Sequence, residues 1–170
     1  NKTATEAAMI LSKLKGEVAR FKGKLNIAIC PTFTALDHSV KTAAGTNIKI
    51  GAQDISLHAS GAYTGEISAS MLLDLGVEYV IIGHSERRHI FGESQEELVK
   101  KFNFYKDLGF KIVYCVGEPL EKREAGNTAM MEYISSQYEG IDTEYENLII
   151  AYEPVWAIGT GLTPTFEDIE

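Results

Sequence analysis

The sequence predicts an α/β domain with a parallel sheet, and three observations support this class. Short apolar runs recur along the chain at intervals that leave room for a helix between each pair. The intervening segments carry apolar residues at helical spacing, and two of them begin with capping signals. No linker, low-complexity tract or break in composition divides the chain, so we expect one domain over residues 1–170.

The apolar runs are the predicted strands, and most are rich in the β-branched residues that strands favour. Because strands and helices alternate, the strands are expected to be parallel and joined by right-handed crossovers. In chain order the predicted strands are Leu25–Cys30, Ile48–Ala52, Tyr79–Gly83, Lys111–Val116 and Leu148–Tyr152.

Two helix starts are marked by capping boxes, in which Ser or Thr and a Glu three residues later satisfy each other's backbone N–H groups. Thr3–Glu6 has this pattern ahead of an apolar helical series, and Ser94–Glu97 has it ahead of a helix that runs to Leu108. Gly109 is expected to end that second helix. Near the end of the sequence, Thr163-Pro164 is expected to start a further helix, with proline at its first position.

Composition places the chain among ordinary globular proteins, with 45% hydrophobic and 24% charged residues. The sequence has no signal-peptide pattern and no apolar run near the roughly 20 residues of a membrane span. A net charge of −8 argues against nucleic-acid or membrane partners. Cys30 and Cys115 lie in apolar strands without metal-ligand spacing, so we expect free thiols, a cytoplasmic location and no metal.

The most informative segment is AYEPVWAIGTG, at residues 151–161. It places Glu153 at the end of an apolar strand, where the following proline restricts the backbone. Trp156 and a Gly-Thr-Gly tip then suit a hinged loop that closes over a substrate and expels water. A simpler interpretation is a strand that ends in an exposed acidic residue and a turn, because glutamates are mostly exposed.

A second strand ends in a comparable way, since Tyr79–Gly83 is followed by His84 and a short helical pattern beginning with Ser85 and Glu86. The positive end of a helix dipole disfavours an imidazolium, so a histidine at this place is expected to be neutral. A neutral ring donates a hydrogen bond to a carbonyl and relays a proton. A lone histidine is more often structural, but a histidine and a glutamate at two strand ends indicate acid–base chemistry.

These segments resemble the triosephosphate isomerase family. The resemblance rests on IGHSERR at residues 82–88 and AYEPVWAIGTG at residues 151–161, with support from GAQ at 51–53, GAYTGE at 61–66 and CVGE at 115–118. The similarity runs in order from Asn1 to Glu170. It implies a (β/α)8 TIM barrel, of which the five predicted strands would be the second to the sixth.

The same resemblance implies that the chain is an incomplete barrel, which lacks the first strand and the last two. The family has eight strand–helix units in roughly 250 residues. Its catalytic lysine would lie two residues upstream of Asn1, so Lys2 is not assigned that role. The glycine-rich loops that hold the substrate phosphate would follow the absent strands, and Glu170 would lie in the first turn of the sixth helix.

By the family's pattern, Glu153 would be the catalytic base and His84 would polarise the substrate carbonyl and shuttle a proton. The backbone N–H of Gly159 would bind the substrate phosphate within the lid. Glu86 would contact the family's lysine, and Cys115 would support the base as an apolar core thiol. Arg87 and Arg88 are expected to be structural ion-pair partners. No organic cofactor is expected, because the proton transfer uses side chains alone.

The polar segment Asp54–Glu66 is the long strand-to-helix connection of this chain. Long loops in compact domains are usually functional or mobile, and an exposed insertion without function is the alternative. In the family this loop inserts into a second subunit, so a homodimer with Thr64 as a contact is implied. Asp54 stands where the family usually has Asn and would add a charge near that interface.

Three functions follow from the sequence. The resemblance implies a triose-phosphate isomerase of glycolysis and gluconeogenesis that interconverts dihydroxyacetone phosphate and D-glyceraldehyde 3-phosphate. The alternative is a catalytically inactive fragment of that enzyme, without the lysine and the phosphate loops. A third possibility is another phosphate-binding βα-barrel enzyme, against which the paired His84 and Glu153 motifs argue.

Overall fold

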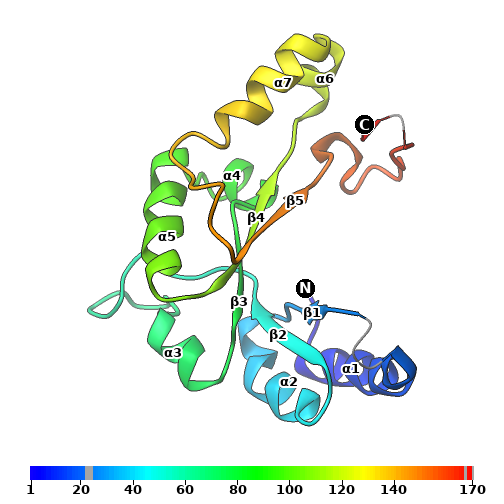
Figure 1. Ribbon diagram of the computed structural model, residues 1–170, viewed down its shortest axis with the longest axis vertical. Helices are drawn as coiled ribbons and strands as arrows, with labels where there is room; N and C mark the ends of the chain where they lie inside the picture. Colours follow the sequence, from blue (N-terminus) through cyan, green and yellow to red (C-terminus); the bar gives the residue numbers. More distant parts are fainter. Residues whose placement is uncertain (22–24, 167, 170) are drawn as a thin grey trace.

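The computed structural model describes residues 1–21, 25–166, 168 and 169, and within them the chain forms a parallel five-stranded sheet (Figure 1). The strands follow the chain order, β1-β2-β3-β4-β5, and every neighbouring pair is parallel. Their bounds are Ile27–Ile29 for β1, Ile48–Ala52 for β2, Tyr79–Ile82 for β3, Lys111–Val116 for β4 and Leu148–Tyr152 for β5. The predicted α/β class with parallel strands is confirmed.

Helices connect the strands along the outer side of the curved sheet, while both termini lie on its other side (Figure 1). Short 3-10 helices cover Ala19–Phe21, Phe33–Ala35 and Val155–Ala157. The α-helices are α1 Ala4–Val18, α2 Leu36–Ala43, α3 Ala69–Asp74, α4 Ser85–His89, α5 Gln95–Asp107, α6 Leu120–Glu124 and α7 Asn127–Ser136. Sequential parallel strands with outer helices are the arrangement of half a (β/α)8 barrel.

Two strand bounds differ from the prediction. β1 spans Ile27–Ile29 rather than Leu25–Cys30, because it pairs with β2 alone and only from Ile27 to Ile29. β3 ends at Ile82 because Gly83 takes a φ of 77°, outside the extended region.

Both predicted capping boxes form, at Thr3–Glu6 before α1 and at Ser94–Glu97 before α5. The helix start predicted at Thr163-Pro164 is wrong, because residues 163–166 are not helical, and the reciprocal bonds of a capping box form between Thr165 and Asp168 instead. The N–H and hydroxyl of Thr165 donate to the Asp168 carboxylate at 2.7 and 2.8 Å, and the Asp168 N–H donates back to the hydroxyl oxygen at 3.3 Å. Of Thr163 and Thr165, only Thr165 has a carboxylate three residues later with which to form such a reciprocal pair.

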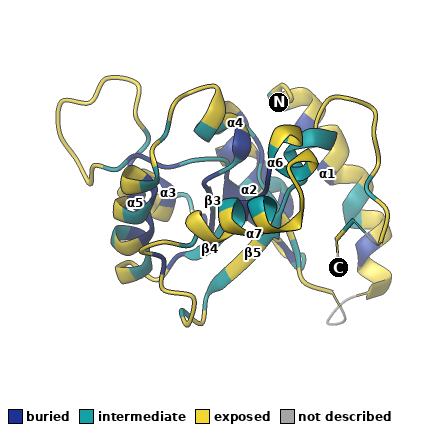
Figure 2. Ribbon diagram, turned by 90° about the horizontal axis from the view of Figure 1, so that it is seen from above, coloured by how far each residue is buried: buried dark blue, intermediate teal, exposed yellow. Residues whose placement is uncertain are grey.

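The core centres on β3, β4 and α5, where Figure 2 shows the buried residues gathered behind exposed helix surfaces. Ile82, Phe102 and Tyr114 are fully buried there. The outermost strand β5 is more open, since Ile149 and Ile150 are 45% and 42% exposed. The fold therefore holds β3 and β4 most firmly; β3 leads to His84, and β4 is the strand against which β5, the strand that leads to Glu153, is paired.

Across the part of the chain that the structure describes, every helix is too short or too polar to cross a membrane.

Candidate active site

The candidate site lies at the carboxyl ends of β3, β4 and β5. The register pairs Ile82 of β3 with Tyr114 of β4, and Val116 of β4 with Tyr152 of β5. The next residues along the outer two strands lead to His84 and Glu153, which the sequence separates by 69 positions and the sheet brings to one edge. The predicted strand-end placement of both side chains is therefore correct.

The side chains of His84 and Glu153 are in contact. His84 Nε2 lies 3.3 Å from Glu153 Oε2. The Glu153 side chain is 14% exposed and that of His84 is 34% exposed. A carboxylate that is largely shielded from water, beside an imidazole that still reaches solvent, is an arrangement suited to proton transfer to and from a bound molecule.

His84 is also the N-cap of the short helix α4, as the sequence indicated. Its Nδ1 accepts a hydrogen bond from the Glu86 backbone N–H at 3.3 Å. A neutral imidazole carries one proton, so an accepting Nδ1 leaves that proton on Nε2. Nε2 is the atom that faces Glu153, so the ring presents an N–H donor to the site.

Ser85 holds the Glu153 carboxylate in place. Its backbone N–H donates to Oε1 at 2.7 Å and its hydroxyl donates to Oε2 at 2.8 Å. Sequence reasoning assigned Ser85 only to the first turn of the helix. Its position next to His84 was the available signal, but its contact with Glu153 depends on how β3 and β5 are placed across β4.

The backbone of Glu153 is fixed from the β4 side. Its N–H donates to the Val116 carbonyl at 2.8 Å, which extends the ladder of β4 and β5 by one residue. Gly117, the residue after Val116, lies so close to Glu153 that a Cβ on it would be 1.7 Å from the Glu153 carbonyl oxygen. Only a residue without a side chain fits against Glu153 at this point.

The segment after Glu153 is attached to the buried carboxylate of Glu118. Glu118 accepts hydrogen bonds from Trp156 Nε1 at 3.0 Å and from the Tyr152 hydroxyl at 3.0 and 3.1 Å. Burial, and then the bond to Glu118, raise the pKa of Tyr152 to about 12. These bonds tie both sides of Glu153 to the end of β4.

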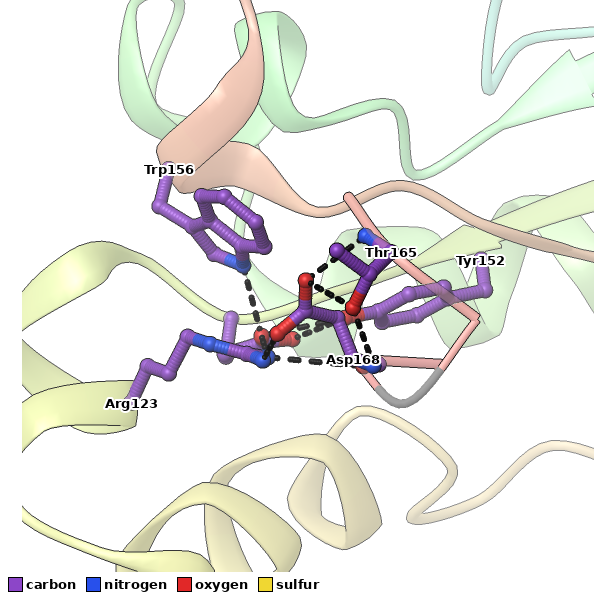
Figure 3. A network of polar contacts seen from close by, with 6 residues as sticks. Arg123, Tyr152, Trp156, Thr165 and Asp168 are labelled. Atoms are coloured by element: carbon purple, nitrogen blue, oxygen red, sulfur yellow. Dashed lines mark hydrogen bonds and ion pairs between the residues drawn. The ribbon is translucent and has the colours of Figure 1, made fainter. Parts of the chain in front are cut away.

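Arg123 of α6 balances the charge of Glu118 and extends this group of contacts. It donates to Glu118 at 3.2 Å, pairs with Asp168 and lies 4.7 Å from the centre of the Trp156 ring. Figure 3 shows the Arg123 side chain pointing toward Asp168, with the Trp156 ring above it. The Arg123 guanidinium thus joins Glu118, which precedes the predicted lid in the sequence, to Asp168, which follows it.

The other predicted site residues lie at different depths. Gly159 is exposed, with a φ of 72°, and Glu86 is 59% exposed with a carboxylate oxygen 3.8 Å from His84 Nδ1. Cys115 is buried in β4, where burial, and then the Glu153 charge, raise the pKa of its thiol to about 12. Thr64 is exposed in the loop between β2 and α3, which projects from the body of the molecule (Figure 1).

A cavity of about 380 Å³ opens beside His84 and extends toward the N-terminus of the chain. Its lining combines polar groups near the strand ends with two aromatic rings, which suits a small polar ligand. The lining residues are Asn1, Phe33, Gln53, Asp54, Ile81, His84, Glu86, Arg87 and Phe91.

Asp54 is paired within the chain rather than left as a free charge. It contacts Lys101 at 2.9 Å and Arg87 at 3.1 Å, and its side chain is 15% exposed. Glu93 joins both cations, so two acids and two bases balance one another. Burial nevertheless raises the pKa of Asp54, and the nearby Lys101 opposes that effect.

Of the two arginines expected to form ion pairs, only Arg87 matches the prediction, through Asp54 and Glu93. For Arg88 the prediction is wrong: its partners in the described structure are neutral. They are the Gly83 carbonyl at 2.7 Å, Gln95 Oε1 at 2.9 Å and the Tyr114 hydroxyl at 3.0 Å. No pattern in the sequence indicates that its side chain turns inward under the site.

Within the described ranges, His, Cys, Asp and Glu side chains do not gather in threes as metal ligands would.

An imidazole beside a shielded carboxylate, at the carboxyl ends of sequential parallel strands, defines the class of barrel-type α/β enzymes, whose sites lie at that end of the barrel. Comparison with known proteins names the family. The family model described as triosephosphate isomerase matches residues 1–170. The chain therefore belongs to the triosephosphate isomerase family.

Individual relatives carry the same name. Triosephosphate isomerase of Sulfurimonas denitrificans is 60% identical over 138 residues, which cover 81% of this chain and 57% of that protein. The Nitratiruptor protein is 52% identical over 146 residues, covering 86% and 61%. The Alkaliphilus oremlandii protein is 43% identical over 173 residues, covering 100% and 69%. The chain thus spans about three fifths of the length of the first two relatives.

Proposed function

We propose that the complete protein to which this chain belongs is a triose-phosphate isomerase, which interconverts dihydroxyacetone phosphate and D-glyceraldehyde 3-phosphate. The observation that carries the proposal is the 3.3 Å contact between His84 Nε2 and the Glu153 carboxylate, on strand ends where the family model also matches. Both reactants are phosphorylated trioses that differ only in the position of a carbonyl. Their interconversion needs a base within reach of two neighbouring carbons and a proton donor beside the two oxygens that these carbons carry.

Glu153 is the base in this proposal. It removes a proton from the carbon next to the carbonyl and returns it to the neighbouring carbon, through an enediol or enediolate. In the structure its carboxylate accepts two hydrogen bonds from Ser85, so both of its oxygens are directed at Ser85. Proton abstraction therefore requires the carboxylate to leave Ser85 and face the substrate carbon, a movement that a bound substrate and a closing lid would favour.

His84 is the electrophile. Its Nε2–H donates to the substrate oxygen on which negative charge develops, and the same nitrogen passes protons between the two oxygens. The Glu86 N–H that binds Nδ1 fixes the tautomer for this role. The exposed carboxylate of Glu86 is placed to pair with a cation that residues 1–170 do not supply. The buried Cys115 supports the base from β4.

Gly159 supplies a backbone N–H to the substrate phosphate when the lid closes. Closure of such a loop is the established behaviour of triosephosphate isomerases, and it shields the reacting carbons from water. Gly159 adopts a left-handed φ of 72°, which glycine tolerates without strain. Trp156, bound to Glu118, holds the amino-terminal part of the lid in the arrangement seen here.

The experiment is isomerase turnover of the complete protein beside its Glu153→Gln variant. Loss of the base is expected to lower kcat by about 10²- to 10⁴-fold. Glu146→Gln is the matched control, because this exposed residue precedes the same strand at its other end. Turnover at the wild-type rate in the Glu153→Gln variant would contradict the proposal.

The second candidate is that residues 1–170 alone are an inactive part of that enzyme. The chain spans 57% and 61% of two relatives, and the family's lysine and phosphate loops are not among its residues. Each missing electrostatic group costs orders of magnitude at a developing enolate. Turnover of the isolated 170-residue chain, with its own Glu153→Gln variant to reveal contaminating isomerase, separates this candidate from the first.

We infer in addition that the complete protein is a cytoplasmic homodimer without metal or cofactor, joined through the loop Asp54–Glu66. The loop projects from the body, Thr64 is exposed on it, and the His58 and Tyr63 rings stack at 3.6 Å to stiffen its tip (Figure 1). Because Asp54 is neutralised inside the chain, its charge does not oppose association. Sedimentation of the complete protein tests this, and a monomer would contradict it.

A further inference from the structure

We propose that Gln137 is a positioning residue for the Glu153 base. Gln137 follows α7, and in the described structure it forms no hydrogen bond with His84 or Glu153. It binds the backbone against which Glu153 rests, and through a second set of contacts it is linked to the backbone that precedes His84. The kinetic part of this inference rests on the proposed function.

The first step is the pairing of Gln137 with Gly117. The Gly117 N–H donates to Gln137 Oε1 at 2.9 Å, and Gln137 Nε2 donates to the Gly117 carbonyl at 3.0 Å. One side-chain amide thus satisfies both backbone groups of one residue. The Gln137 residue is only 5% exposed, so both bonds are shielded from water.

Gly117 needs this support because of where it lies. β4 ends at Val116, so Gly117 is outside the regular strand pairing, and a residue without a side chain has the widest choice of backbone angles. The same residue cannot be stiffened by a side chain of its own, since a Cβ would lie 1.7 Å from the Glu153 carbonyl oxygen. Gln137 therefore supplies from outside the rigidity that Gly117 lacks.

The second step connects Gln137 to the His84 side of the site. The Tyr114 hydroxyl donates to the Gln137 carbonyl at 2.6 Å, and Arg88 donates to that hydroxyl oxygen at 3.0 Å. Arg88 Nε also donates to the Gly83 carbonyl at 2.7 Å, directly before His84. The backbones leading to the base and to the electrophile are thus held by one continuous group of polar contacts, which is buried around Gln137 and partly buried around Arg88.

The neighbouring Ser136 lies outside this group of contacts. Its hydroxyl donates to the Tyr133 carbonyl within α7 at 2.7 Å, and the residue is exposed. In the described structure its side chain has no hydrogen bond to Gly117, Tyr114 or Arg88. Ser136 therefore provides the comparison for a test.

The test compares Gln137→Met and Ser136→Ala in the complete protein. Each change removes the hydrogen bonds of one side chain, and Gln137→Met also keeps the length of the side chain. If Gln137 positions the base, Gln137→Met lowers kcat by about 10- to 100-fold, as small misplacements of a catalytic group do, with KM within about threefold of wild type. Ser136→Ala keeps both constants within about threefold. Equal kcat in the two folded variants would overturn the inference.

A second readout does not depend on isomerase activity. The ring resonances of His84 report the Glu153 carboxylate 3.3 Å away, so Gln137→Met shifts them and Ser136→Ala leaves them in place. If the wild-type protein shows no isomerase turnover, the proposed function fails, while these resonances still decide the role of Gln137. Unchanged resonances in Gln137→Met would overturn it.

Gln137→Asn serves if the methionine variant does not fold. It keeps a polar amide at the site, but a side chain one methylene shorter cannot reach both backbone groups of Gly117. The same fall in kcat and the same shift of the His84 resonances are expected. Wild-type kcat in this variant would overturn the inference.

Discussion

At the scale of single residues, the short distance between the Gly117 and Glu153 backbones determines the position of the base. Gly117 lets β4 approach Glu153 more closely than any side chain would permit, and Ser85 receives the carboxylate from the other side. Both residues act without chemistry of their own. They show that a glutamate at a strand end becomes a candidate base only when its backbone and its carboxylate are each held separately.

Gly117→Ala is predicted to disable the site. The added methyl group must displace the Glu153 carbonyl, since it would start 1.7 Å from it. We expect kcat of the complete protein to fall by about 100-fold and the free energy of unfolding to fall by about 1–3 kcal/mol. Steady-state kinetics and denaturant unfolding measure the two effects.

Gly16→Ala is the control for this change, because Gly16 lies inside α1 with open space where a Cβ would go. The same substitution there is expected to leave kcat unchanged and to stabilise the helix by about 0.5–1 kcal/mol. Equal effects of the two alanines on kcat would show that the Gly117 contact is irrelevant to the site.

At the scale of elements, the site joins the ends of strands that are far apart in the sequence. α6 contributes to it through Arg123, which joins Glu118 at the end of β4 to Asp168 beyond the predicted lid (Figure 3). Glu118 is fully buried, so the guanidinium is the cation that compensates its charge. The lid is therefore anchored by electrostatics at its base, while its tip around Gly159 stays exposed.

Arg123→Met is predicted to destabilise the complete protein by about 3 kcal/mol, since it leaves the buried Glu118 carboxylate without its cation. Thermal and denaturant unfolding measure this. The neighbouring Lys122→Met removes a charge that meets the Tyr133 ring at 5.8 Å, and a loss below about 1 kcal/mol is expected. Similar losses in both variants would mean that Arg123 acts as an ordinary surface charge.

The sequence predicted the elements better than the contacts between them. Strand positions and the two capping boxes are encoded locally, in apolar runs and in pairs of residues three apart, so they were found within one or two residues. The Ser85–Glu153 and Gln137–Gly117 bonds join positions 68 and 20 residues apart. The inward turn of Arg88 likewise depends on Tyr114 and Gln95, which only the assembled sheet brings beneath it.

The Thr163-Pro164 prediction failed for a local reason. Proline marks the start of many helices, but a reciprocal cap also needs an acceptor three residues on, and only Thr165 has one in Asp168.

The catalytic pair was recognisable because the family's motifs surround both residues. The supporting residues were not, because an amide or a serine that binds a distant backbone leaves no pattern in its own neighbourhood.

At the scale of the whole molecule, the sheet is open at both edges. β1 pairs only with β2, and β5 pairs only with β4, in the part of the chain that the structure describes. Closing a barrel removes such edges, whereas an open parallel sheet presents unpaired backbone groups to other chains. The exposed Ile149 and Ile150 add apolar surface to the β5 edge.

The isolated 170-residue chain is therefore predicted to associate with itself as its concentration rises, by pairing at the open edges. Sedimentation velocity over a hundredfold range of concentration measures this. Ile149→Lys places a charge on the edge strand, which opposes edge pairing, and should shift association to higher concentration. Leu73→Lys, on α3 away from both edges, makes the same change at a residue that is 49% exposed and should have little effect. A chain that stays monomeric throughout, or that responds equally to both lysines, would show that the edges of this half-barrel are not what brings copies together.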